Sequence, residues 1–176
     1  MKQSYDKLNY RDEEDLSYLI HDKSHVLLTR KSRLEGLENA FKYYSELAPH
    51  LYRGLYKEEV QEIGNLQRGK TFSFGAYLSF SEKVTVGFSF GSETHHLLFL
   101  KKGMGFNYCK YSTSVLEELK QSNPKEYNAV DGDFLIKELE SEKEWILPRE
   151  TKFTITDFNS GLGFTVIECT SQILRR

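Results

Sequence analysis

The chain has 176 residues, of which 39% are hydrophobic and 28% charged; these values fit one globular domain and exclude a disordered chain. Its net charge of −2 gives no overall positive field that would draw it to nucleic acid or an anionic membrane, although a local basic patch stays open. It contains no apolar run near the roughly 20 residues of a membrane span and no apolar N-terminal stretch, so we expect a single cytosolic domain over residues 1–176.

The first 50 residues have a helical pattern. An acidic start at residues 12–15 precedes apolar residues spaced by three and four, and Ser24 is a candidate cap for a following helix. A longer helix is expected to pack against a sheet and to end before Pro49. Its apolar stripe consists of Leu34, Leu37, Phe41, Tyr44 and Leu47.

From residue 51 onward the pattern changes to short β-rich runs bounded by Gly, Pro, Asn or charge clusters. A short helix is expected over residues 113–119, before a loop at Asn123-Pro124. Helices first and strands later predict an α+β domain, with a helical lead over 1–50 and a β-rich core over 51–176. The predicted strands cover residues 71–74, 77–80, 97–100, 145–147, 152–155 and 164–167.

The sequence contains none of the common short motifs for binding a nucleotide phosphate or a catalytic zinc ion. The chain has no Gly-rich phosphate loop and no H-E-x-x-H helix, which excludes Rossmann and P-loop chemistry. The two cysteines, Cys109 and Cys169, lie far apart in the sequence, so we expect buried thiols rather than a disulfide or zinc site. His95 and His96 are adjacent and would point to opposite faces of a strand, so we expect no metal.

Two polar motifs interrupt the apolar strands. Arg53 lies in an apolar run and can offer a planar fork of donors to a phosphate, while Gly54 would let a ligand approach the backbone. A surface arginine in a salt bridge would look the same. Ser79 and Ser81 would share one face of a strand, where one hydroxyl can orient a nearby carboxylate. A solvated strand face is the alternative.

A third motif holds two carboxylates. Glu142 and Glu144 would enter a strand on the same side, which costs repulsion unless a cation or a catalytic task compensates. Glutamates also alternate from residue 138 to residue 144, and an acidic solvated strand edge would show the same pattern. Both interpretations stay open on this motif alone.

Together and in this order, the three motifs resemble the Arg, Ser-x-Ser and Glu-x-Glu elements of the arginine-directed mono-ADP-ribosyltransferases. Size and layout look most like the small phage enzymes of the Alt and Mod type. Three stretches carry the resemblance. Residues 52–54 match the family's Y/W-R-G context of the arginine, and residues 87–90 match the A-x-x-F pattern that ends the helix after Ser-x-Ser. Residues 145–148 match the hydrophobic residues and proline that follow Glu-x-Glu. The chain departs from the family at Phe80, commonly Thr, and at Gly87, usually Ala. Weak helix propensity leaves open an extended segment at residues 84–87.

The resemblance implies a β-rich core of two antiparallel-type sheets around an NAD cleft, with the helical lead packed on it. It also implies a toxin-like effector that transfers ADP-ribose from NAD to arginines of target proteins, in the host cytosol if phage-encoded. NAD is then the co-substrate, without a metal. The implied catalytic residues are Arg53 on the phosphates, Ser79 fixing Glu144, Glu144 at the ribose cation and Glu142 at the acceptor. Tyr52, the Gly54 backbone and Phe90 join Arg53, Ser79 and Glu144 in the implied NAD site.

Other acceptors and other functions stay open at this point. The same NAD site would also serve with water, a small guanidino compound or nucleic acid as acceptor, and Lys101-Lys102 or residues 30–33 would then supply a basic patch. A non-enzymatic module is the remaining alternative, with the acidic stretch at residues 138–144 binding a basic partner.

Overall fold

The computed structural model of the protein describes Phe41, residues 45–149 and residues 151–173. The helices predicted before Phe41 lie outside these residues. The predicted helical stripe is wrong at its end, because Ser45–Ala48 form strand β1. Two causes act here. Pro49 disfavours helical backbone at Ala48, and β1 pairs with a longer strand, with Leu47 opposite Met104.

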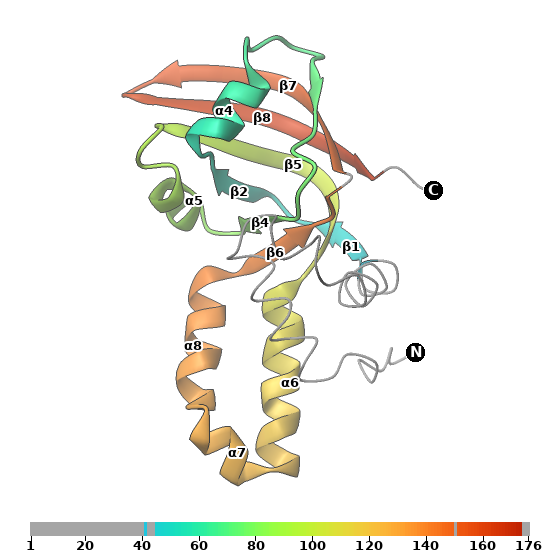
Figure 1. Ribbon diagram of the computed structural model, residues 1–176, viewed down its shortest axis with the longest axis vertical. Helices are drawn as coiled ribbons and strands as arrows, with labels where there is room; N and C mark the ends of the chain where they lie inside the picture. Colours follow the sequence, from blue (N-terminus) through green and yellow to red (C-terminus); the bar gives the residue numbers. More distant parts are fainter. Residues whose placement is uncertain (1–40, 42–44, 150, 174–176) are drawn as a thin grey trace.

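The strands described form one eight-stranded hydrogen-bonded sheet (Figure 1). All pairs are antiparallel except that of β5 with β8, which is parallel. The order is β2-β4-β6-β5-β8-β7-β3, with β1 on β5 and a further pairing of β2 with β5. The strands are β1, β2 (Leu51–Gly54), β3 (Thr71–Phe72), β4 (Leu78–Ser81), β5 (His96–Phe106), β6 (Glu144–Leu147), β7 (Thr151–Gly161) and β8 (Phe164–Ile173).

Strand β5 connects the parts that we expected as two separate antiparallel sheets. Residues 97–100 pair with β2 on one side and β8 on the other, whereas residues 103–106 pair with β1 and Phe106 also pairs with β6. The strand runs past its predicted end because Lys102 still pairs with Thr170 of β8 and residues 103–106 pair with β1. The exposed Lys101 also forms an ion pair with Glu168 of β8 at 2.5 Å.

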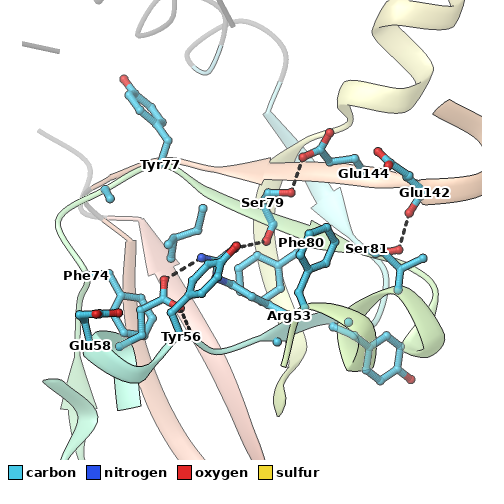
Figure 2. A pocket seen from close by; sticks show the side chains of 18 of the residues that line it. Arg53, Tyr56, Glu58, Phe74, Tyr77, Ser79, Phe80, Ser81, Glu142 and Glu144 are labelled. Carbon is cyan, nitrogen blue, oxygen red and sulfur yellow. Dashed lines mark hydrogen bonds and ion pairs between the residues drawn. The ribbon is translucent and has the colours of Figure 1, made fainter. Parts of the chain in front are cut away.

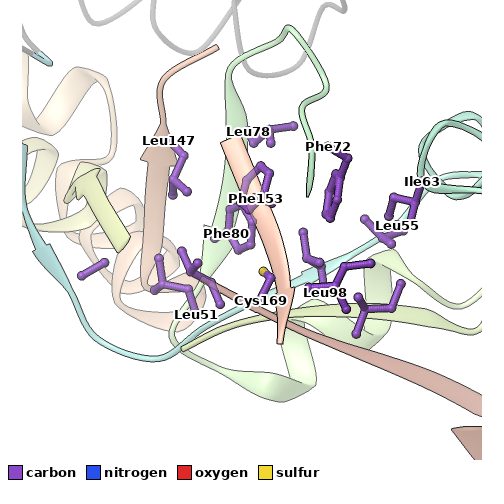
Figure 3. Close-up of a cluster of buried hydrophobic side chains, with 14 of the residues drawn as sticks. Leu51, Leu55, Ile63, Phe72, Leu78, Phe80, Leu98, Leu147, Phe153 and Cys169 are labelled. Carbon is purple, nitrogen blue, oxygen red and sulfur yellow. The ribbon is translucent and has the colours of Figure 1, made fainter. Parts of the chain in front are cut away.

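The hydrophobic core lies between β2, β4, β6 and the β5, β7 and β8 strands (Figure 3). Its largest members include Phe80, Phe153 and Leu98, each no more than 2% exposed, and each such side chain contributes about 1.5–3 kcal/mol by leaving water. Both cysteines are buried free thiols, as predicted. Burial raises the pKa of the Cys109 and Cys169 thiols, so both stay protonated at neutral pH.

Alternation along β4 and β6 separates the core from a polar face. Leu78 and Phe80 of β4 point into the core, together with Trp145 and Leu147 of β6. Residues between them must point to the other face, because successive side chains in a strand alternate. The residues at 79, 81 and 144 therefore share that face.

The described helices are α4 (Lys57–Ile63), α5 (Val84–Phe90), α6 (Tyr108–Ser122), α7 (Pro124–Ala129) and α8 (Gly132–Glu142). The helix predicted over 113–119 lies inside α6, which begins earlier because the Asn107 side chain caps it. Residues 84–87 are helical and not extended. The alternative interpretation of residues 138–144 as an acidic strand edge does not hold, because good helix formers place residues 138–142 in α8. None of the described helices is long and apolar enough to cross a membrane.

Helices α6, α7 and α8 form an arm that projects from the sheet and returns the chain to β6 (Figure 1). At its tip, Asp133 accepts hydrogen bonds from the Tyr127 hydroxyl at 2.7 Å and from the Lys120 ammonium at 2.9 Å. These two donors, Tyr127 first, hold the pKa of the Asp133 carboxyl below its usual range. Gly132 is required beside them, since a Cβ there would lie 2.1 Å from the Tyr127 ring.

Candidate active site

A cleft of about 530 Å³ is lined by residues of β2, α4, β4, α5, the end of α8 and β6 (Figure 2). Segments that lie almost a hundred residues apart in the sequence meet there. The cleft contains every residue that the sequence predicted for the site: Tyr52, Arg53, Gly54, Ser79, Phe90, Glu142 and Glu144.

Arg53 lies in the wall of the cleft with its side chain 13% exposed. Its Nη1 donates to the backbone carbonyl of Ser79 at 2.8 Å, and its Nη2 donates to Oε1 of Glu59 at 2.7 Å. The guanidinium also lies over the Tyr56 ring, 5.7 Å from its centroid. The arginine is therefore ion-paired, but inside the cleft and not on the outer surface.

Ser79 joins the arginine to a glutamate. Its hydroxyl donates a hydrogen bond to Oε1 of Glu144, while its backbone carbonyl accepts from Arg53 (Figure 2). The strand pairing supplies this geometry, because Ser81 lies opposite Glu144 and Ser79 opposite Ile146, so Ser79 reaches Glu144 diagonally. One serine thus fixes the position of Glu144 relative to Arg53.

Glu142 is supported differently. It ends α8, and Lys143 follows with a left-handed φ of 50° before Glu144 begins β6. The expectation that both glutamates enter one strand is therefore wrong. The left-handed residue makes the chain turn between them, yet both line the same cleft.

Residues 81–83, which we call the clamp, hold the chain around Glu142. The Ser81 hydroxyl donates to the Glu142 carbonyl, and the Lys83 ammonium donates to the Glu140 carbonyl at 3.0 Å. The amide of Glu82 donates to the Lys143 carbonyl at 3.2 Å. These bonds satisfy carbonyl groups that the end of α8 would otherwise leave open.

The glycine after the arginine serves close helix packing. A Cβ at Gly54 would lie 1.9 Å from the backbone nitrogen of Gly91, so α5 occupies the space that we had attributed to an approaching ligand. Close packing also explains why Gly87 stands where the family usually has alanine, since a Cβ there would lie 2.9 Å from Cβ of Tyr52. Both glycines allow α5 to lie directly on β2, which places Phe90, 56% exposed, at the cleft.

Helix α4 adds acidic residues that the sequence analysis missed, namely Glu58, Glu59 and Glu62. With Glu142 and Glu144 they make five glutamates beside one arginine, so the lining is strongly acidic. One signal could have revealed Glu59, because it stands three residues after Tyr56 and accepts its amide at 2.9 Å, as glutamates do at helix starts. The described residues hold no group of three or more metal-ligating side chains.

No protein-family model matches this chain, and no curated protein sequence matches it. Among solved structures, the ADP-ribosyltransferase Vis from Vibrio splendidus, in complex with agmatine, is 14% identical, with 97% of this chain and 78% of that chain covered and a TM-score of 0.59. An ADP-ribosyltransferase from Clostridium botulinum is 14% identical, with coverages of 93% and 87% and a TM-score of 0.56.

Exoenzyme S from Pseudomonas aeruginosa, in complex with human 14-3-3 protein beta and bound to Carba-NAD, is 17% identical, with coverages of 95% and 70% and a TM-score of 0.57. At such identities the likeness concerns the fold. The chain has a mixed helix and strand fold with a sheet core similar to that of ADP-ribosyltransferases. The closer likeness to phage enzymes of the Alt and Mod type stays a prediction.

Proposed function

We propose that this protein is an NAD-dependent mono-ADP-ribosyltransferase that transfers ADP-ribose to arginine side chains of target proteins and releases nicotinamide. One observation carries the proposal. Ser79 bonds both Arg53 and Glu144 within a single cleft that Glu142 also lines. The likeness of the fold to solved ADP-ribosyltransferases supports the same activity.

Transfer begins when the bond between ribose C1′ and the nicotinamide nitrogen breaks. The electron pair leaves with neutral nicotinamide, and positive charge develops at C1′, as it does in glycoside hydrolysis. In the proposed site the Glu144 carboxylate stabilises that charge, and the Ser79 hydroxyl holds the carboxylate in place. A carboxylate fixed before the reaction need not reorganise during it.

The remaining site residues would bind NAD. Arg53 uses one donor on each terminal nitrogen within the protein, which leaves further N–H groups for the phosphates. The exposed ring of Phe90 would pack against the nicotinamide, with Tyr52 beside it.

The acidic lining favours a cationic acceptor. Glu142 would align a guanidinium and take a proton from the nitrogen that attacks C1′. Five glutamates in the cleft attract such a group and disfavour a nucleic-acid acceptor. The complex of Vis with agmatine, a guanidino compound, supports an acceptor of this class.

Incubation with labelled NAD and agmatine tests the proposal. We expect release of nicotinamide and ADP-ribosylated agmatine with the wild type, and neither product with Glu144→Gln. Glu138→Gln is the matched control, since Glu138 is exposed on α8 and does not line the cleft. The same assay in a bacterial lysate would then reveal protein targets by the label they carry.

The other outcomes separate the alternatives. If free ADP-ribose were the only product formed beside nicotinamide, water would be the acceptor, and transfer to a guanidino group would be contradicted. Label on added nucleic acid but not on agmatine or protein would contradict an arginine acceptor. Absence of both nicotinamide release and an NAD-induced rise in melting temperature would favour a non-enzymatic module.

A further inference from the structure

Resting on the proposed function, we propose that Glu59 is a positioning residue for Arg53, holding its guanidinium in the orientation that binds the phosphates of NAD. Glu59 lies in the first turn of α4 and accepts from Nη2 of Arg53, whereas the Ser79 carbonyl of β4 accepts from Nη1. A strand carbonyl and a helix carboxylate therefore bind the two terminal nitrogens of the guanidinium separately.

The Glu59 side chain is itself fixed. Oε1 accepts from Arg53 Nη2 at 2.7 Å, and Oε2 accepts from the Tyr56 amide at 2.9 Å. Only 14% of the side chain is exposed. Helix α4 is anchored in turn by Ile63, which is 1% exposed. Both carboxylate oxygens are thus engaged on a packed element, and Glu59 cannot turn away without breaking two bonds.

Two contacts determine the orientation of Arg53. A guanidinium is planar, so bonds at both terminal nitrogens fix its plane as well as its position. Without Glu59, the guanidinium would keep one hydrogen bond, to the Ser79 carbonyl, and could rotate about it into several orientations that NAD would then have to order. Glu59 removes that freedom before NAD arrives.

Because Glu59 is negatively charged, removing it can either strengthen or weaken NAD binding, and the direction of the change distinguishes two roles. A carboxylate beside the phosphate site repels phosphate, so removing it would strengthen NAD binding if charge alone mattered. If orientation of Arg53 matters more, removal weakens binding. The neighbours Glu58 and Glu62 are exposed, and among the described residues neither forms a hydrogen bond or ion pair with Arg53.

Dissociation constants of three ligands test the proposal. For Glu59→Ala we expect binding of NAD and of ADP-ribose, which carries the phosphates, to weaken about tenfold or more. Binding of nicotinamide alone should not change. Glu59→Gln should lie between, because the amide nitrogen that replaces one oxygen cannot accept, so the bond to Arg53 or the bond to the Tyr56 amide is lost. Gln61→Ala is the matched control, being exposed on the same helix and outside the cleft.

A double-mutant cycle separates positioning from general damage. If Glu59 acts through Arg53, Glu59→Ala should cause no further loss of ADP-ribose binding in an Arg53→Ala background. Additive losses, equal weakening of nicotinamide, or tighter NAD binding would each overturn the proposal. If Glu59→Ala does not fold, Glu59→Gln answers the same question. Wild-type protein that fails to bind NAD would instead refute the proposed function.

Discussion

Glu144 and Glu142 are separated by one residue, yet the structure supports them in different ways. Glu144 belongs to a strand paired with β4, and the Ser79 hydroxyl holds its carboxylate. Glu142 ends a helix of the arm, and the clamp holds its backbone by hydrogen bonds to carbonyl groups. One glutamate has its side chain fixed, whereas the other has its main chain fixed.

This difference fits the two tasks that we propose for these glutamates. A carboxylate that stabilises a developing cation gains from a fixed position, because any reorganisation would add to the barrier. A carboxylate that receives an acceptor must fit groups that arrive from another molecule. Four predictions test the comparison, in order of decreasing expected effect.

The first concerns the glutamate in the strand. Glu144→Gln should lower both transfer to agmatine and hydrolysis of NAD by a hundredfold or more, on the order of 2–4 kcal/mol of barrier, because both reactions need the cation at C1′. Nicotinamide release in the presence and absence of agmatine measures this. Full hydrolysis with lost transfer would assign Glu144 to the acceptor instead.

The second concerns the glutamate at the helix end. Glu142→Gln should reduce transfer by roughly a hundredfold but keep most NAD hydrolysis, since only the proton acceptor for the guanidino group is lost. The ratio of ADP-ribosyl-agmatine to free ADP-ribose reports the change. Equal loss of transfer and hydrolysis would contradict the proposal that the two glutamates have different roles.

The third compares the two serines. Ser79→Ala should slow transfer and hydrolysis together by about tenfold, because Glu144 loses a hydrogen bond to its charged group. Ser81→Ala removes a bond to the Glu142 carbonyl, so it should reduce transfer more than hydrolysis. The two product ratios provide the measurement, and identical ratios would contradict separate supports.

The fourth concerns the arm that carries Glu142. The lowered pKa of Asp133 means that its stabilising effect is present above the unfolded-state pKa of about 3.9 and is lost as pH falls through the folded-state value. Asp133→Asn should therefore melt at a lower temperature than the wild type at pH 6, and the difference should shrink as pH falls below the unfolded-state pKa. Hydrolysis at pH 7 should change by about twofold or less. A difference independent of pH would contradict this.

Much of the β core could be predicted, because strands alternate and end at Gly, Asn or charged residues. The strand runs at residues 97–100, 145–147 and 164–167 all lie inside observed strands. The motif residues could be placed by their order along the chain. Their convergence in one cleft depends on pairing between distant strands, which no local pattern contains.

Other features could not be predicted, for identifiable reasons. Alternating glutamates at residues 138–144 resemble a strand edge, but helix propensity and packing of the arm decide otherwise. The role of Gly54 depends on α5 lying against it, a contact between residues more than 30 positions apart. Glu59 was missed because no helix was expected at residues 57–63.

The pairing of β2 with both β4 and β5, and of β6 with the same two strands, closes a ring of four strands. No strand that carries Arg53, Ser79 or Glu144 therefore has a free edge. Displacing any one of them would break two ladders at once, so the ring keeps the backbone positions of these three residues fixed relative to one another.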